Sequence, residues 1–159
     1  MRRAALLVTA AAALATASPA HALIVPQKGI RGVRLLDSVQ KVRERLGAPD
    51  AVIFSRHPII GRVRTYKYGL TYVGFNGAGA DAKVQAVSTT SRRERTSRGV
   101  GVGTRRALVP ARVPGAKCSV EFGVDHCYVG AFRAGRRVTD FRIGSNGRVT
   151  GVVVGFVVD

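Results

Sequence analysis

Residues 62–75 read RVRTYKYGLTYVGF, and this stretch decides the fold class. Successive residues of a β-strand point to opposite faces, so Val63, Thr65 and Lys67 share one face of a first strand. Gly69 marks a turn, and the residues after it predict a second strand. Alternation of this kind is typical of an antiparallel sheet that has one face in solvent.

Further strands are predicted on both sides of this stretch, from alternating or apolar runs that end at turn residues. Asn146-Gly147 is a strong signal for a tight hairpin between the last two of them. The predicted strands are 51–56, 62–68, 70–75 and 84–90 in the first part of the chain, and 119–122, 127–132, 138–143 and 149–158 in the second.

A short helix is predicted just before the first strand. Asp37 is a suitable N-cap, Gln40 completes a capping box, and Gly47 ends the helix. Val42 and Leu46 lie on one side of it at helical spacing. A helix of about ten residues is not stable alone in water, so its apolar side must pack against the sheet.

The same order of elements recurs later in the chain. The glycine-rich run 99–103 leads to Thr104, the predicted N-cap of a second short helix that stops at Pro110. We therefore predict an α+β fold in which short helices pack on one face of an antiparallel sheet, built as two tandem similar halves. The expected halves are residues 23–95 and 96–159.

The glycines of the 99–103 run have two explanations. Glycine lets backbone N–H groups approach a phosphate closely at the start of a helix. A P-loop, however, requires a lysine after its last glycine, and Gly103 is followed by Thr104. Tight turning of the chain between strand and helix is the explanation that we favour.

Two segments carry a resemblance to a known group of small exported modules. They are Gly32-x-x-Leu35-x-Asp37-Ser38-x-x-x-Val42-x-x-x-Leu46-Gly47-x-Pro49, and Thr96-x-x-Gly99-Val100-Gly101-Val102-Gly103-Thr104 with Pro114-Gly115-Ala116-x-Cys118 and Cys127. The pattern resembles β-lactamase inhibitory protein-like modules and the small lipoproteins of the outer-membrane barrel-assembly machinery. The resemblance implies helices on one face of an antiparallel sheet and no cofactor. It does not extend to the loop side chains with which such inhibitors act.

The N-terminus predicts export. Residues 1–22 combine Arg2 and Arg3, a short Ala- and Leu-rich run, and small residues at Ala20 and Ala22, as in a secretory signal peptide. The apolar run is too short to span a bilayer, so we expect cleavage after Ala22 and no transmembrane segment in the mature chain. The protein is then secreted or held in the cell envelope. Its first residues, 23–30, are predicted to form an irregular arm.

Cys118 and Cys127 are the only two cysteines. An even number of cysteines in an exported chain favours a disulfide bond. A zinc site would need more ligands than Asp125 and His126, the metal-binding residue types nearby. We predict the Cys118–Cys127 disulfide and no metal site.

The chain is strongly basic, with a formal net charge of +17 that comes mostly from arginine. Such an excess attracts nucleic acid, acidic wall polymers, anionic lipid surfaces or an acidic protein. Abundant Ala, Gly, Val and Arg with little Lys is also what the codon usage of a GC-rich genome would produce. Both explanations remain open at the level of the sequence.

Catalytic groups are poorly supplied. Nucleophilic catalysis needs a base beside a Ser, Thr or Cys and a third group that orients the base. After signal cleavage the histidines are His57, in a predicted loop, and His126, beside Cys127. Asp125 and His126 point to opposite faces if they lie in a strand. We therefore expect no enzyme activity and no cofactor.

The combined prediction is a secreted, non-catalytic binding module that meets a protein partner through an exposed sheet face or loops. The alternative is an arginine-rich envelope protein that binds anionic polymer or nucleic acid. Exposed Tyr and Arg dominate binding surfaces. The predicted interaction surface comprises Arg62, Arg64, Tyr66, Tyr68, Tyr72, Arg92, Arg93 and Arg95.

Overall fold

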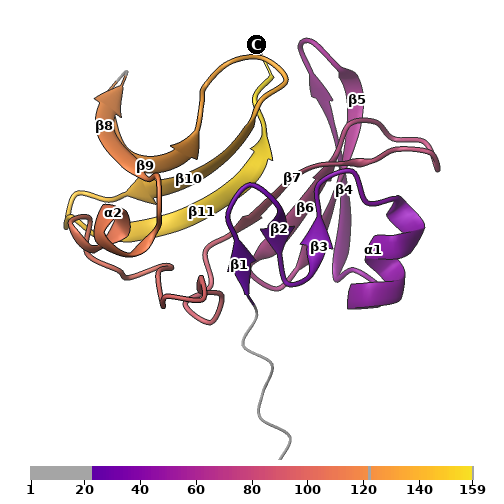
Figure 1. The fold of residues 1–159 in the computed structure, drawn as a ribbon. Helices are drawn as coiled ribbons and strands as arrows, with labels where there is room; N and C mark the ends of the chain where they lie inside the picture. Colours follow the sequence, from indigo (N-terminus) through magenta and orange to yellow (C-terminus); the bar gives the residue numbers. More distant parts are fainter. Residues whose placement is uncertain (1–22, 122, 159) are drawn as a thin grey trace, which may run out of the picture.

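The computed structural model describes residues 23–121 and 123–158 (Figure 1). The predicted signal peptide, residues 1–22, lies outside the described residues. The elements in chain order are β1 (Ile24–Val25), β2 (Gly29–Ile30), β3 (Val33–Arg34), α1 (Val39–Leu46), β4 (Ala51–His57), β5 (Gly61–Tyr68), β6 (Thr71–Phe75), β7 (Val84–Thr89), α2 (Leu108–Arg112), β8 (Lys117–Glu121), β9 (Val124–Gly130), β10 (Arg137–Ile143) and β11 (Val149–Phe156).

Eight of the strands form one antiparallel sheet in the order β4-β5-β6-β7-β11-β10-β9-β8. Strands β4 to β7 follow one another as neighbours, and so do β8 to β11. The two sets join where β7 pairs with β11, with Val87 opposite Val154. The fold is therefore α+β, dominated by antiparallel sheet. The similarity of the two halves stays a prediction.

The core lies against one face of this sheet, which we name the covered face. One buried or half-buried row of facing residues crosses seven strands on it: Tyr68, Thr71, Thr89, Val152, Phe141, Cys127 and Cys118. A single buried cluster joins this face to Val42 of α1 and Val109 of α2. Figure 1 shows the two helices at opposite ends of the sheet, with β1–β3 between them.

The prediction of an irregular arm at residues 23–30 was wrong, because this segment contributes to a second, three-stranded sheet of β1, β2 and β3. Ile24, Ile30 and Val33 are each at most 1% exposed, so packing against the large sheet orders these short strands. Gly29 cannot be replaced, since a Cβ at this position would overlap the carbonyl of Val33. The backbone N–H of Gln27 donates to Thr139 Oγ1 at 2.6 Å and ties the arm to β10.

The N-cap of α1 lies one residue after the predicted position, Asp37. Ser38 caps the helix, and its hydroxyl accepts from the N–H of Lys41 at 3.2 Å. Asp37 instead accepts from the N–H of Arg34 at 2.8 Å and pairs with Lys41 at 3.1 Å. The predicted role of Gly47 holds, since it ends the helix with a positive φ of 80°.

The second helix also starts later than the sequence predicts. Thr104 does not cap it, because its hydroxyl accepts from the N–H of Gly101 at 3.1 Å and closes the glycine-rich turn. Helix α2 begins at Leu108 after Ala107 and contains Pro110, the residue expected to stop it. Proline is tolerated in a first helical turn, where the backbone N–H has no partner within the helix. Its buried residue is Val109.

The predicted Cys118–Cys127 disulfide is present, between directly opposite residues of β8 and β9. Among the described residues, no helix is both long enough and apolar enough to cross a bilayer.

Candidate functional site

The second face of the eight-stranded sheet, here called the open face, carries half-buried side chains in place of a core. Its central row crosses all eight strands, and the residues of this row are Ala51, Lys67, Tyr72, Ser88, Val153, Asp140, Tyr128 and Lys117. Both described helices and the β1–β3 sheet contribute to the core on the covered face. The open face therefore stays available for contact with another molecule.

A hollow of about 640 Å³ lies at the centre of the open face, over the junction of β7 and β11. Its floor is made of small residues, including Gly74, Ala86 and Gly151. Tyr72 of β6 and Arg142 of β10 line it from the two sides of that junction. Because the floor carries little side chain, a projecting group of a partner can approach the sheet backbone there.

Next to this hollow, three neighbouring strands bring together a hydrogen-bonded array. His126 of β9 lies with Nε2 3.2 Å from Ser119 Oγ of β8. Its Nδ1 is 3.0 Å from Asp140 Oδ1 of β10. Ser119 also donates to Glu121 Oε1 at 2.9 Å, and Arg142 Nε lies 3.7 Å from Asp140 Oδ2. We call these five residues the His126 array.

Aromatic side chains and burial hold the array in place. The His126 ring stacks on Phe132 and lies beside Tyr128, with ring centroids 5.2 Å apart in both cases. Burial raises the pKa of the Asp140 carboxyl above its ordinary value, although His126 and Arg142 act in the opposite direction. Across the described part of the chain, no group of three or more His, Cys, Asp or Glu side chains is placed to hold a metal ion.

The predicted surface tyrosines do not form one surface. Tyr66 and Tyr68 are 5% and 6% exposed on the covered face, and burial raises the pKa of the Tyr68 hydroxyl. Tyr72 lies on the open face, opposite Lys67 and Ser88. The prediction grouped the three tyrosines, because the sequence shows neither the register that sets the face of Tyr72 nor which face the helices cover.

The predicted arginines of β5 also belong to the covered side. Arg64 lies over the rings of Tyr66 and Phe75, with its guanidinium carbon 5.4 and 5.5 Å from the ring centroids. Arg62 lies over Phe54 at 4.8 Å. Arg64 is half-buried while Arg62 stays exposed beside Phe54, and neither residue contributes to the open face.

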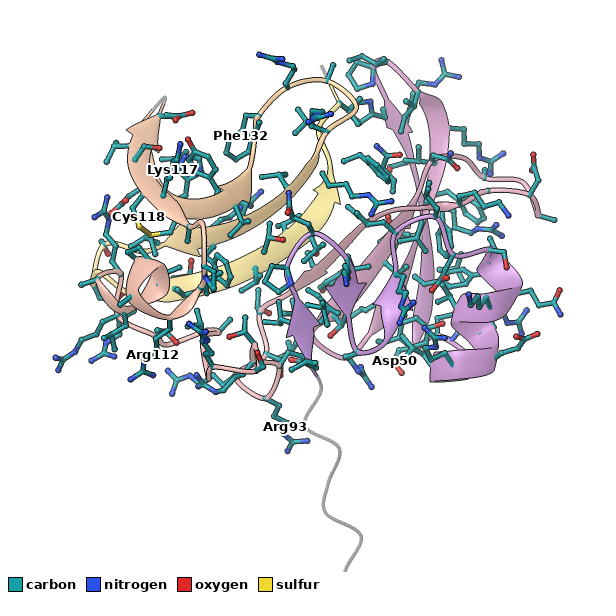
Figure 2. All side chains as sticks on the ribbon, viewed as in Figure 1. Asp50, Arg93, Arg112, Lys117, Cys118 and Phe132 are labelled. Carbon is teal, nitrogen blue, oxygen red and sulfur yellow. A yellow bond between two sulfur atoms is a disulfide. The ribbon has the colours of Figure 1, made fainter. Side chains whose placement is uncertain are left out.

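The connector arginines divide into one structural and two exposed residues. Arg95 donates to the carbonyls of Gly99 at 2.9 Å and Val102 at 3.3 Å, so it holds the glycine-rich turn. Arg92 and Arg93 are exposed. Figure 2 shows Arg93 and Arg112 along the lower margin of the molecule, well away from Phe132.

The sequence prediction missed Ser119, Glu121, Asp140 and Arg142. Strand pairing brings them together, with His126 opposite Ser119 of β8 and Arg142 of β10. The predicted strand 127–132 also left out His126, because β9 begins three residues earlier and runs over Val124–Gly130. His57 is not part of this site, since its Nδ1 accepts from the N–H of Ile59 within the β4–β5 turn.

Comparison with known proteins supports the fold alone. No protein family model matches the sequence, and no curated protein matches it. An extracellular protein from Bacillus anthracis that contains an SCP domain has a similar structure, with a TM-score of 0.50 and 9% sequence identity. The similarity covers 77% of this chain and 44% of that protein, so this chain spans less than half of its length.

A DUF4309 family protein from Bacillus subtilis is also similar, with a TM-score of 0.43, 14% identity, and coverage of 80% of this chain and 84% of that one. Neither protein is described as a β-lactamase inhibitory protein-like module. That resemblance therefore remains an interpretation of the sequence.

Proposed function

We propose that this chain is an exported, non-catalytic binding protein whose open face contacts a protein partner. The hollow between Tyr72 and Arg142 carries this proposal, because Tyr and Arg are the residue types that contribute most to protein interfaces. The neighbouring His126 array, with Tyr128 and Phe132 beside it, supplies further polar and aromatic groups. Export is supported by the signal-peptide pattern of residues 1–22 and by the disulfide, since disulfides persist outside the cytoplasm.

Site-specific crosslinking tests the proposal. A photoreactive phenylalanine analogue at position 72 should form an adduct with one protein from the culture supernatant or envelope fraction, because the side chain lies on the open face. The same analogue at Leu108, in α2 on the other side of the sheet, is the matched control. Tyr72→Ala should weaken binding of that protein by about tenfold or more. Equal adducts from both positions, or none from position 72, would contradict the proposal.

The His126 array has the connectivity of a serine hydrolase triad, so the non-catalytic part of the proposal needs its own argument. A Ser119 hydroxyl that donates to Glu121 cannot donate to His126 at the same time. A serine whose hydroxyl proton is held by a carboxylate is not set to pass that proton to the imidazole, as the nucleophile of a triad must. In this arrangement the array is a rigid polar part of the binding face.

A fluorophosphonate probe tests this arrangement, because it labels only activated serine nucleophiles. We expect the wild-type protein and Ser119→Ala to show the same background labelling. Mass spectrometry of the tryptic peptide that contains Ser119 measures the result directly. Stoichiometric labelling of Ser119, lost in His126→Gln, would show that the protein is a hydrolase and refute the non-catalytic proposal.

A second candidate function is binding of an anionic polymer or nucleic acid through the arginines. It is supported by the net charge of +17 and by the exposed arginines on the margin that carries Arg93 and Arg112. Binding of this kind weakens steeply as the salt concentration rises. Contact with a protein at the hollow beside Tyr72 depends far less on salt, since it rests on shape and apolar area.

A further inference from the structure

Three arginines from separate segments of the chain lie around Gly103. Arg148 Nη1, from the β10–β11 hairpin, donates to the carbonyl of Gly103 at 2.9 Å. Arg92 of the connector has its Nε 4.0 Å from the point where a Cβ on Gly103 would lie. The backbone of Arg105, two residues after Gly103, pairs with that of Arg148 in an isolated antiparallel bridge, and directly opposite residues of such a pair have their side chains on the same side. We call Arg92, Arg105 and Arg148 the Gly103 corner.

The backbone at this corner is held firmly. The N–H of Gly103 donates to the carbonyl of Val149 at 2.7 Å, and the N–H of Val149 donates to the carbonyl of Thr104 at 2.9 Å. Arg106 N–H donates to the carbonyl of Gly147 at 2.9 Å. These bonds fasten the segment before α2 to the β10–β11 hairpin. The backbones that carry Arg105 and Arg148 are thereby set in place before any ligand arrives, which lowers the entropy cost of binding.

The corner is an uncompensated cluster of positive charge. In the described ranges, the ion pairs involve Glu94, Asp37, Asp125 and Asp140, and none of their partners is Arg92, Arg105 or Arg148. All three arginines of the corner are exposed. Their guanidinium groups therefore keep most of their donors available to a ligand, although Arg148 uses one on Gly103.

We propose that the Gly103 corner binds a phosphate group carried by an anionic polymer, an inference that rests on the second candidate function. A guanidinium group presents a planar pair of donors that matches two oxygens of one anion. Three such groups on neighbouring segments offer more donors than a carboxylate can use, since a carboxylate has only two oxygens in one plane, and they suit the oxygens of a tetrahedral phosphate better. Arg93 on the same connector and Arg112 at the end of α2 extend the positive surface along a polymer.

The test uses the mature, disulfide-bonded chain and fluorescently labelled polyphosphate of defined length, with binding measured by anisotropy. Arg92→Gln/Arg105→Gln removes two charges from the corner and leaves the Arg148–Gly103 bond intact. We expect its affinity to fall by about tenfold or more. The matched control, Arg34→Gln/Arg56→Gln, removes two exposed arginines elsewhere and should change affinity by less than about twofold.

Competition by small anions distinguishes recognition of the phosphate group from general charge attraction. When the two salts are compared at equal ionic strength, inorganic phosphate should displace more polyphosphate than chloride does. Equal losses in the two double variants, or equal displacement by the two salts, would overturn the corner while leaving polyanion binding as such intact. Failure of the wild-type chain to bind polyphosphate at low salt would overturn both.

Discussion

Phe141→Ala is expected to lower the free energy of unfolding by about 3–5 kcal/mol, the usual cost of removing a buried aromatic ring. Phe141 is 0% exposed on β10 and lies opposite Val152 and Cys127 in the central row of the covered face. Truncation of the Phe141 side chain leaves a cavity in the core, where β9, β10 and β11 contribute buried side chains. Since a domain of this size is stable by only about 5–15 kcal/mol, the variant loses a large fraction of its stability.

Urea denaturation followed by circular dichroism measures this loss. Phe54→Ala is the matched control, because it removes the same atoms from a side chain that is 50% exposed on the edge strand β4. We expect the control to cost less than about 1 kcal/mol, since little apolar surface returns to water. Similar losses in the two variants would show that the core is not centred on the covered face as described.

The second large effect is expected from Cys118→Ser/Cys127→Ser. The disulfide joins residues nine apart in sequence, and the chain-entropy model assigns the closure of such a loop about 2–3 kcal/mol. The consequence is also local, because β8 is the last strand of the sheet and, within the described part of the chain, pairs with β9 alone. Without the disulfide, β8 should separate from the sheet more readily and take Ser119 away from His126.

Two measurements separate these contributions. Denaturation of the double variant gives the global loss, and treatment of the wild type with a reductant should reproduce it without affecting the variant. Hydrogen exchange should show faster exchange of the β8 amides than of those in β10 and β11. Ser119→Ala serves as the control, since it removes one array hydrogen bond but keeps the covalent link. Unchanged exchange in β8 after reduction would refute the view that the disulfide secures this edge.

Much of the fold follows from local sequence patterns. The alternation in residues 62–75 predicted β5 and β6 to within a residue at most ends, because side chains alternate between faces whatever the neighbouring strands are. The disulfide followed from cysteine number and the signal-peptide pattern. Cap positions were less secure, since both Asp37 and Ser38 can cap, and only the contacts with Arg34 and Lys41 decide between them.

The candidate site depended on information that local patterns do not contain. Alternation placed Tyr66 and Tyr68 on one face of their strand, but the face of Tyr72 depends on the register between β5 and β6. The packing of β1–β3 and the helices buried Tyr66 and left Tyr72 on the open face. The predicted surface therefore mixed residues of the core with residues that a partner can reach.

By itself, the sequence of this protein determined most strands of the large sheet, the main turns between them, that an antiparallel sheet with short helices results, and that two cysteines pair. These features depend on residues close together in the chain. Only the tertiary structure decided that β7 pairs with β11, that Ser119 and Asp140 flank His126, and that Arg92, Arg105 and Arg148 meet at Gly103. The physical reason is that strand order and register are set by the burial of the whole core, to which every element contributes at once.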